Sequence, residues 1–191
     1  MRISRFLALV IALSLAGAVG NDAFGQRTVN SALMLTAEYS YPFSGNGDDI
    51  CLDLCCGQYQ LNSYWNAGIT GNLYSHDLKN ESMMQYAQIA AIGEWMYRLV
   101  GTRNRAVNLY LGGGMFIGYE AYDPFGKLPE YFETGLGDGS FLYGIHAKLE
   151  GEFFIWRNVA IVLGGRLPVN FTSPVSKLNY HVSAGLRINL K

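Results

Sequence analysis

The sequence predicts an all-β protein: an eight-stranded antiparallel up-and-down β-barrel of the outer-membrane type. Along several segments apolar residues alternate with polar ones, and a period of two is the pattern of β-strands. The charged residues of these segments all lie on the alternate, polar face. Only 15% of the 191 residues are charged, whereas roughly 25% is usual in soluble domains. The chain also has 23 glycines and is 14% aromatic, which suits a β-rich chain in an unusual solvent.

The N-terminal segment, residues 1–25, has the features of a signal peptide. Two arginines precede an apolar core that is too short to span a bilayer, and small residues follow. We expect cleavage after Gly25, with a site nearer Ala18 or Gly20 as the alternative, so that residues 26–191 form the barrel domain of an exported protein. A membrane-anchoring helix is the competing interpretation.

Three segments in the first half of the chain show the alternation clearly. The first, Thr28–Tyr41, sets Leu33 and Leu35 against Thr36 and Glu38. In the second segment, Ser63–Tyr74, the apolar face is Trp65, Ala67, Ile69, Gly71 and Leu73. In the third, Met83–Leu99, it is Ala87, Ile89, Ala91, Gly93, Trp95, Tyr97 and Leu99. We therefore predict three strands over these ranges.

Four more segments follow in the second half. Their ranges are Ala106–Tyr119, Phe141–Trp156, Val159–Phe171 and Leu178–Leu190. In Phe141–Trp156 every second residue is apolar or glycine, and Lys148, Glu150 and Glu152 lie on the other face of the ribbon. This strict alternation predicts strands with one apolar and one polar face.

An eighth strand is predicted between the segments Thr28–Tyr41 and Ser63–Tyr74. Single-chain bacterial membrane barrels have an even number of strands, and the gap from Tyr41 to Ser63 is long for a connection. The range Ile50–Tyr59 in this gap has apolar residues at period two. With eight strands, three short connections share one side of the barrel and the longer ones share the other. The short connections are Gln60–Asn62, Gly101–Asn104 and Trp156–Asn158.

The charges on the polar faces decide between two kinds of barrel. They are Glu38, Asp53, Glu94, Arg98, Lys148, Glu150, Glu152, Arg166 and Arg187. A soluble barrel or sandwich would turn them to water, whereas a membrane barrel would turn them into its lumen. Scarce charges, bulky apolar faces and aromatics near strand ends favour the membrane barrel. We predict a network of matched lumen charges formed by Glu38, Glu94, Arg98, Lys148, Glu150, Glu152, Arg166 and Arg187.

Three cysteines, Cys51, Cys55 and Cys56, lie close together. Their number is odd, and adjacent residues of a strand face opposite ways, so the three cannot all pair within one chain. The spacing lacks the histidines of a typical zinc site. We expect free thiols within a strand, with a disulfide and a metal site as alternatives.

Three later segments resemble the conjugal transfer protein TraO family of conjugative transposons in the Bacteroides group. The residues that carry the resemblance are NLYLGGGMFIGYEAYDP (108–124), FLYGIHAKLEGEFFIWRNVAIVLGGR (141–166) and the final LNYHVSAGLRINL. The resemblance covers most of the mature chain and is weakest over residues 30–62. It implies a non-enzymatic, structural component of a conjugative DNA-transfer (type IV secretion) apparatus at the outer membrane, whose partners are the lipid bilayer and other proteins of the apparatus.

Two other functions remain open, an outer-membrane enzyme that modifies lipid A and a small structural barrel of the OmpA or OmpX type. The enzyme would use His146, His181 and Ser183, because a hydroxyl, an imidazole and an acid form hydrolytic triads. The alternative for both histidines is a place in a polar lumen. A net charge of −1 gives no reason to expect direct nucleic-acid binding, and no cofactor or metal site is expected.

Two loops and a glycine run have compositions that could suit a binding site. The oxygen-rich loop Ser44–Asp49 lacks the spacing of a calcium-binding EF-hand, and Gly112–Gly114 precedes no helix that would make it a phosphate site. The loop Tyr119–Gly139 is the candidate contact surface for a partner protein. Its candidate contact residues are Tyr122, Asp123, Phe125, Tyr131 and Phe132.

Overall fold

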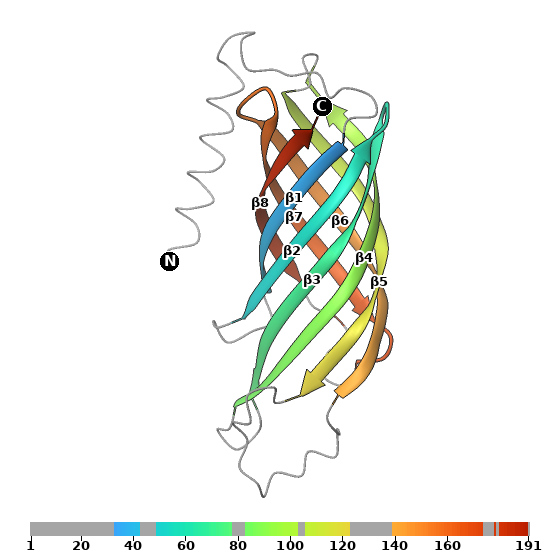
Figure 1. Cartoon of the computed structure of the whole chain (residues 1–191), viewed down its shortest axis with the longest axis vertical. Helices are drawn as coiled ribbons and strands as arrows, with labels where there is room; N and C mark the ends of the chain where they lie inside the picture. The colour runs from blue at the N-terminus through green and yellow to red at the C-terminus, as the bar shows by residue number, and fades with distance from the viewer. Residues whose placement is uncertain are drawn as a thin grey trace, which may run out of the picture.

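The computed structural model describes residues 33–42, 49–77, 83–102, 106–122, 139–173, 178 and 180–190, with the backbone alone for 75–77 and 83–85. Within these residues all the regular structure is β-strand, and eight strands close into a barrel in the order β1 to β8 (Figure 1). Every neighbouring pair is antiparallel, and β1 pairs with β8 to complete the circle. The predicted fold class is therefore confirmed. The predicted signal peptide lies outside the described residues.

The strand bounds agree with the predicted ones to within a few residues. They are β1 Leu33–Pro42, β2 Ile50–Tyr59, β3 Ser63–Asp77, β4 Met83–Gly101, β5 Val107–Tyr122, β6 Gly139–Phe154, β7 Val159–Asn170 and β8 His181–Leu190. The strand expected from parity, β2, is present and pairs with both of its neighbours.

Several predicted strand ends are wrong. Strands β3 and β5 extend three residues beyond their predicted ends, to Asp77 and Tyr122. Strand β6 stops at Phe154 instead of Trp156, because the N–H groups of Ile155 and Trp156 both donate to the Val159 carbonyl and close a tight turn. Strand β8 begins at His181, and Leu178 joins β7 through one isolated bridge to Val169.

The barrel is polar inside and apolar outside. Lys148, Glu150 and Glu152 are at most 1% exposed, whereas Met115 on the outer wall is 69% exposed. A soluble barrel would have the opposite polarity, so the soluble alternative is wrong for this fold. No helix in the described part of the chain is long and apolar enough to cross a membrane.

Aromatic side chains on the outer wall gather toward both rims. Trp65, Trp95 and Tyr97 mark one rim, and Tyr119 and Phe141 mark the other; all five are at least one-third exposed. Girdles of this kind flank the apolar band of outer-membrane barrels.

The wall of the barrel has unequal height. Strands β1, β2 and β8 have 10 residues each, whereas β4 has 19. About 9–11 tilted residues cross a bilayer, so the extra residues of β3 to β6 stand beyond the apolar band. In Figure 1 these strands reach the lower end of the barrel, while β1 and β2 stop above it.

Candidate functional site: the barrel lumen

Lys148 of β6 lies at the centre of a buried ion-pair network. Its Nζ is 2.7 Å from Glu38 Oε1 on β1 and 3.0 Å from Glu150 Oε2 on its own strand. A third carboxylate, Glu94 Oε2 on β4, is 3.6 Å away. One ammonium group therefore ties together three carboxylates from three strands, and all four side chains are at most 3% exposed.

Arg187 of β8 extends the network toward the end of the barrel that carries the short turns. Its Nη1 is 2.8 Å from Glu150 Oε1 and 3.1 Å from Glu152 Oε1. Its Nε donates to Thr36 Oγ1 at 2.9 Å, and the guanidinium lies 4.5 Å from the centre of the Tyr64 ring. A fully buried arginine with this many partners is held in one orientation.

Arg166 of β7 forms the other end of the network. Its two terminal nitrogens contact Asp53 Oδ2 at 2.7 Å and Glu94 Oε1 at 2.8 Å. The same oxygen of Glu94 lies 2.9 Å from Nε2 of His146. Glu94 therefore connects the Arg166 contacts with those of Lys148.

A layer of aromatic rings closes the lumen beside Arg187. Tyr59, Tyr64 and Tyr110 pack edge to face, with ring centres 5.8 and 4.9 Å apart, and Met34 and Met96 fill the space around them. Tyr64 donates to Glu150 at 2.6 Å, and Tyr59 donates to Glu152. The hydroxyls thus supply hydrogen bonds to carboxylates that the cations alone do not saturate.

The ion pairs contain more acids than permanent cations. Five carboxylates (Glu38, Asp53, Glu94, Glu150, Glu152) face three cations (Lys148, Arg166, Arg187) in the ion pairs of the described residues. Glu38 and Asp53 are also direct cross-strand neighbours. The lumen is therefore a filled, acid-rich polar core.

Most members of the predicted charge network are brought together in this core. Arg98 is the exception, because it lies at the rim and its Nη2 donates to Asn62 Oδ1 at 2.7 Å. Asp53, which the sequence placed on the polar face but outside the predicted network, pairs with Arg166.

Glu120 was missed because the predicted strand ended at Tyr119. It is 0% exposed, accepts a hydrogen bond from Gln88 and is 3.0 Å from Ser173 Oγ. Continuing the alternation from Gly118 by one step would have placed Glu120 inside the barrel.

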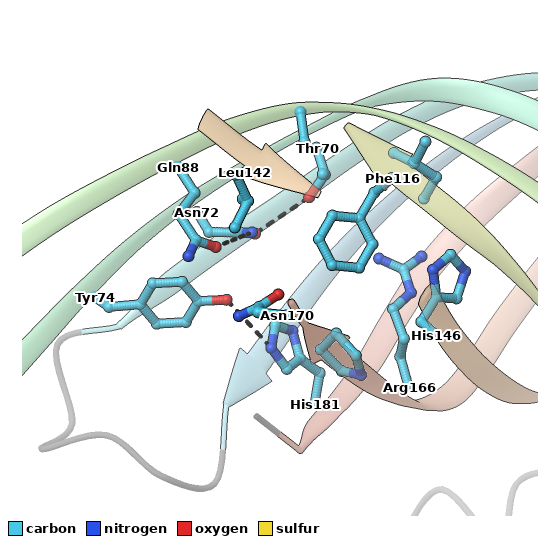
Figure 2. A pocket seen from close by; sticks show the side chains of 13 residues that line it. Thr70, Asn72, Tyr74, Gln88, Phe116, Leu142, His146, Arg166, Asn170 and His181 are labelled. Carbon is cyan, nitrogen blue, oxygen red and sulfur yellow. Dashed lines mark hydrogen bonds between the residues drawn. The ribbon is translucent and has the colours of Figure 1, made fainter. Parts of the chain in front are cut away.

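A small cavity remains in the lumen on the far side of Arg166 from the tyrosine layer. Its volume is about 30 Å³, enough for one or two water molecules. Figure 2 shows its wall, in which Tyr74 points at His181 and Asn72 bridges Thr70 and Gln88. The Tyr74 hydroxyl and His181 Nε2 are 3.2 Å apart.

The three residues that an enzyme would use, His146, His181 and Ser183, are all buried in the lumen. They do not form a catalytic triad. His146 contacts Glu94 and His181 contacts Tyr74. Ser183 Oγ has no hydrogen-bond partner. A nucleophilic serine needs a base within hydrogen-bond reach, and the described side chains provide none.

Cys51 and Cys55 are buried inside the barrel, whereas Cys56 is exposed on the outer wall; all three thiols are free. Gly112–Gly114 lie within β5. No cluster of metal-ligating side chains occurs in the part of the chain that the structure describes.

Of the predicted contact loop Tyr119–Gly139, the structure describes only the two ends, residues 119–122 and Gly139. Tyr122 is buried at the mouth of the barrel, and its hydroxyl oxygen lies 3.0 Å from Ser140 Oγ. Asp123, Phe125, Tyr131 and Phe132 lie outside the described residues, as does most of the loop Ser44–Asp49. The contact surface stays a prediction.

The sequence over residues 44–190 matches the family described as "Conjugative transposon protein TraO". The chain belongs to the TraO family. The predicted family resemblance is confirmed, and the match includes seven of the eight strands of this TraO-family barrel in full. Among curated proteins, none matches the TraO-family chain.

Solved structures of outer-membrane barrels are similar to this TraO-family chain. Neisserial surface protein A (NspA) has 14% identity and a TM-score of 0.56, covering 83% of this chain and 95% of NspA. The N-terminal β-barrel domain of Pseudomonas aeruginosa OprF has 10% identity and a TM-score of 0.53, covering 84% and 98% of the two chains. At these identities the similarity shows the fold alone.

Proposed function

We propose that this chain is a non-enzymatic outer-membrane component of the apparatus that transfers conjugative DNA, with a role in anchoring or assembling that apparatus. The observation that carries the proposal is membership of the TraO family over residues 44–190. The apolar outer wall between two aromatic rims supports a place in a bilayer. Export by the N-terminal signal peptide is part of the same proposal.

The filled lumen favours a structural role over a conducting one. Eight strands enclose a space just wide enough for side chains, and here ion pairs and a tyrosine layer occupy it. A DNA strand therefore has no room inside this barrel. The partners that we propose are the lipid bilayer and other proteins of the transfer apparatus, without direct contact to nucleic acid.

The test is deletion of the gene in a donor strain, followed by measurement of transfer frequency. We expect transfer to fall and to return when the gene is supplied in trans. The complementing protein should fractionate with the outer membrane and show heat-dependent gel mobility. It should also cross-link to other transfer proteins. Unchanged transfer in the deletion strain would contradict the proposal.

A second readout separates the structural role from the enzymatic alternative. Lipid A from the deletion strain and from its parent should give the same mass spectrum. A lipid A species that disappears on deletion and returns on complementation would support the enzyme instead.

A further inference from the structure

The connections at the two ends of the barrel carry opposite charge. At the short-turn end, the upper end in Figure 1, the strands are joined by residues 60–62, 102–106 and 155–158. In sequence these connections contain three arginines and no acidic residue. The connections at the other end contain seven acidic residues against three lysines; they are residues 43–49, 78–82, 123–138 and 171–180. The short-turn end is therefore the one that attracts anions.

Two arginines of the short-turn end lie within the described residues. Arg157 is exposed in the turn after β6, and Arg98, near the end of β4, donates from Nη2 to Asn62 Oδ1 at 2.7 Å. Neither forms an ion pair with another described residue. The last carboxylate of β6, Glu152, is 0% exposed and is paired with Arg187. The described part of the barrel thus leaves these two cations without a counter-ion.

Exposed apolar side chains accompany the two arginines. Leu61, Val100 and Trp156 are 62%, 67% and 65% exposed, and Trp156 precedes Arg157 directly in the chain. A mixture of apolar and cationic groups suits the boundary between hydrocarbon and water, where tryptophan is enriched and arginine reaches out with its charged end. We call this surface the basic rim; its residues are Leu61, Arg98, Val100, Trp156 and Arg157.

The basic rim lies at the depth of lipid headgroups. Val100 is three residues past Tyr97 of the aromatic girdle, roughly 10 Å along the strand at about 3.3 Å per residue. On a strand tilted by about 40° this distance is roughly 8 Å of height. Headgroups occupy roughly 5–8 Å beyond the hydrocarbon on each side. The side chains of the basic rim are therefore level with lipid phosphates.

The backbone of the basic rim is tied to neighbouring strands. The Arg98 N–H donates to the Asn62 carbonyl at 2.8 Å, and the Asn189 N–H donates to the Asn158 carbonyl at 2.8 Å. A surface that is already ordered binds a ligand with little loss of freedom. Because the connections at this end are short, they offer little surface beyond the headgroups for a soluble partner to contact. A lipid is consequently favoured over a protein as the anionic ligand.

We propose that the basic rim binds anionic phospholipid headgroups, such as phosphatidylglycerol, in preference to zwitterionic ones. Arg98 and Arg157 contact the phosphates, and the apolar side chains of the rim pack on the glycerol and the first acyl carbons. Guanidinium groups suit phosphate oxygens because they donate two parallel hydrogen bonds. The inference rests on the place of the barrel in a bilayer, which is part of the proposed function, but not on a role in conjugation.

The experiment is native mass spectrometry of the full chain, released from nanodiscs of phosphatidylcholine with a minor share of phosphatidylglycerol and identical acyl chains. We expect the lipids that stay on the barrel to be enriched in phosphatidylglycerol about fivefold over the nanodisc as a whole, the factor expected for one cation near an anionic surface. Phosphatidylethanolamine in place of phosphatidylglycerol should show no enrichment, because it is zwitterionic.

Variants of the two arginines assign the effect to the basic rim. Arg98→Gln and Arg157→Gln should each lower the enrichment, and the double variant should lower it further. Arg157→Lys keeps the charge and should retain most of it. Lys177→Gln is the matched control, because Lys177 belongs to the connection between β7 and β8 at the opposite end, and it should leave the enrichment unchanged. Heat-dependent gel mobility checks that each variant is folded.

Three results would overturn the proposal: no enrichment with the parent chain, enrichment that the double variant leaves unchanged, or an equal loss in Lys177→Gln. An acidic protein segment is the competing ligand. A polyglutamate peptide that binds the barrel in phosphatidylcholine nanodiscs, and no longer binds Arg157→Gln, would assign the rim to such a segment if phosphatidylglycerol is not enriched. All of these outcomes can be read whether or not deletion of the gene lowers transfer.

Discussion

Lys148 and Glu38 meet across the lumen with 2.7 Å between Nζ and Oε1, although 110 residues separate them in the chain. The contact joins the first strand of the barrel to the sixth through its interior. Neither side chain is more than 3% exposed. This ion pair is consequently a tertiary contact that depends on the closed barrel.

Removing this cation should strongly destabilise the barrel. Lys148→Met leaves Glu38, Glu94 and Glu150 without their shared ammonium group, and breaking a buried pair on one side costs about 3–5 kcal/mol. The measurement is the free energy of unfolding in urea from lipid vesicles. Arg98→Gln is the control, since Arg98 lies at the rim, and a change of about 0.5 kcal/mol or less is expected there. Equal effects of the two substitutions would show that the network contributes little.

A charge on the outer wall should be penalised according to its depth. Met115 lies midway between the two aromatic rims on β5 and is 69% exposed. Met115→Arg should cost about 2–4 kcal/mol in a bilayer, whereas Leu33→Arg at the rim should cost about 0–1 kcal/mol. The same urea titration gives both values. A barrel whose outer wall faced water would tolerate both substitutions alike.

Two glycines of β3 should respond differently to alanine. A Cβ at the inward Gly68 would collide with the backbone oxygen of Leu54, whereas one at the outward Gly71 meets nothing within 4 Å. Gly68→Ala should cost about 1–3 kcal/mol through the forced backbone shift. Gly71→Ala should leave the unfolding midpoint close to that of the parent protein. A tolerated Gly68→Ala would mean that β2 and β3 are farther apart than the structure has them.

Ser183→Ala should be silent in every assay. The Ser183 hydroxyl is buried and makes no hydrogen bond, and removing an unsatisfied polar group is nearly neutral or slightly stabilising. The variant should restore conjugative transfer in a deletion strain as well as the parent gene does, with unchanged lipid A. Loss of transfer with normal barrel stability would assign Ser183 a chemical role.

The strands and their polarity could be predicted from sequence because both depend on local alternation. Strand β2 is weaker in pattern, yet parity required it and the structure contains it. The ends of β6 and β8 were less predictable. The turn after Phe154 depends on backbone hydrogen bonds to Val159, and nothing in the alternation signals where such a turn begins.

The partners within the lumen could not be predicted in the same way. Alternation places Lys148, Glu94 and Glu38 inside, but which side chains meet depends on the tilt and stagger of strands far apart in sequence. The hydroxyls of Tyr59 and Tyr64 show the same limit. Alternation along β2 and β3 is consistent with both rings lying inside, but their contacts with Glu152 and Glu150 follow only from the closed barrel.

The place of Arg187 on the last strand has a consequence for how the chain assembles. Its guanidinium neutralises Glu150 and Glu152 of β6 and binds Thr36 of β1. Until β8 is in place, Glu152 lacks its arginine and Glu150 keeps only Lys148 of its own strand. These carboxylates would then enter hydrocarbon at a high energetic cost. Stepwise insertion of hairpins is therefore disfavoured. The chain should remain at the membrane surface until its C-terminal strand has docked, and then cross the bilayer in one cooperative event.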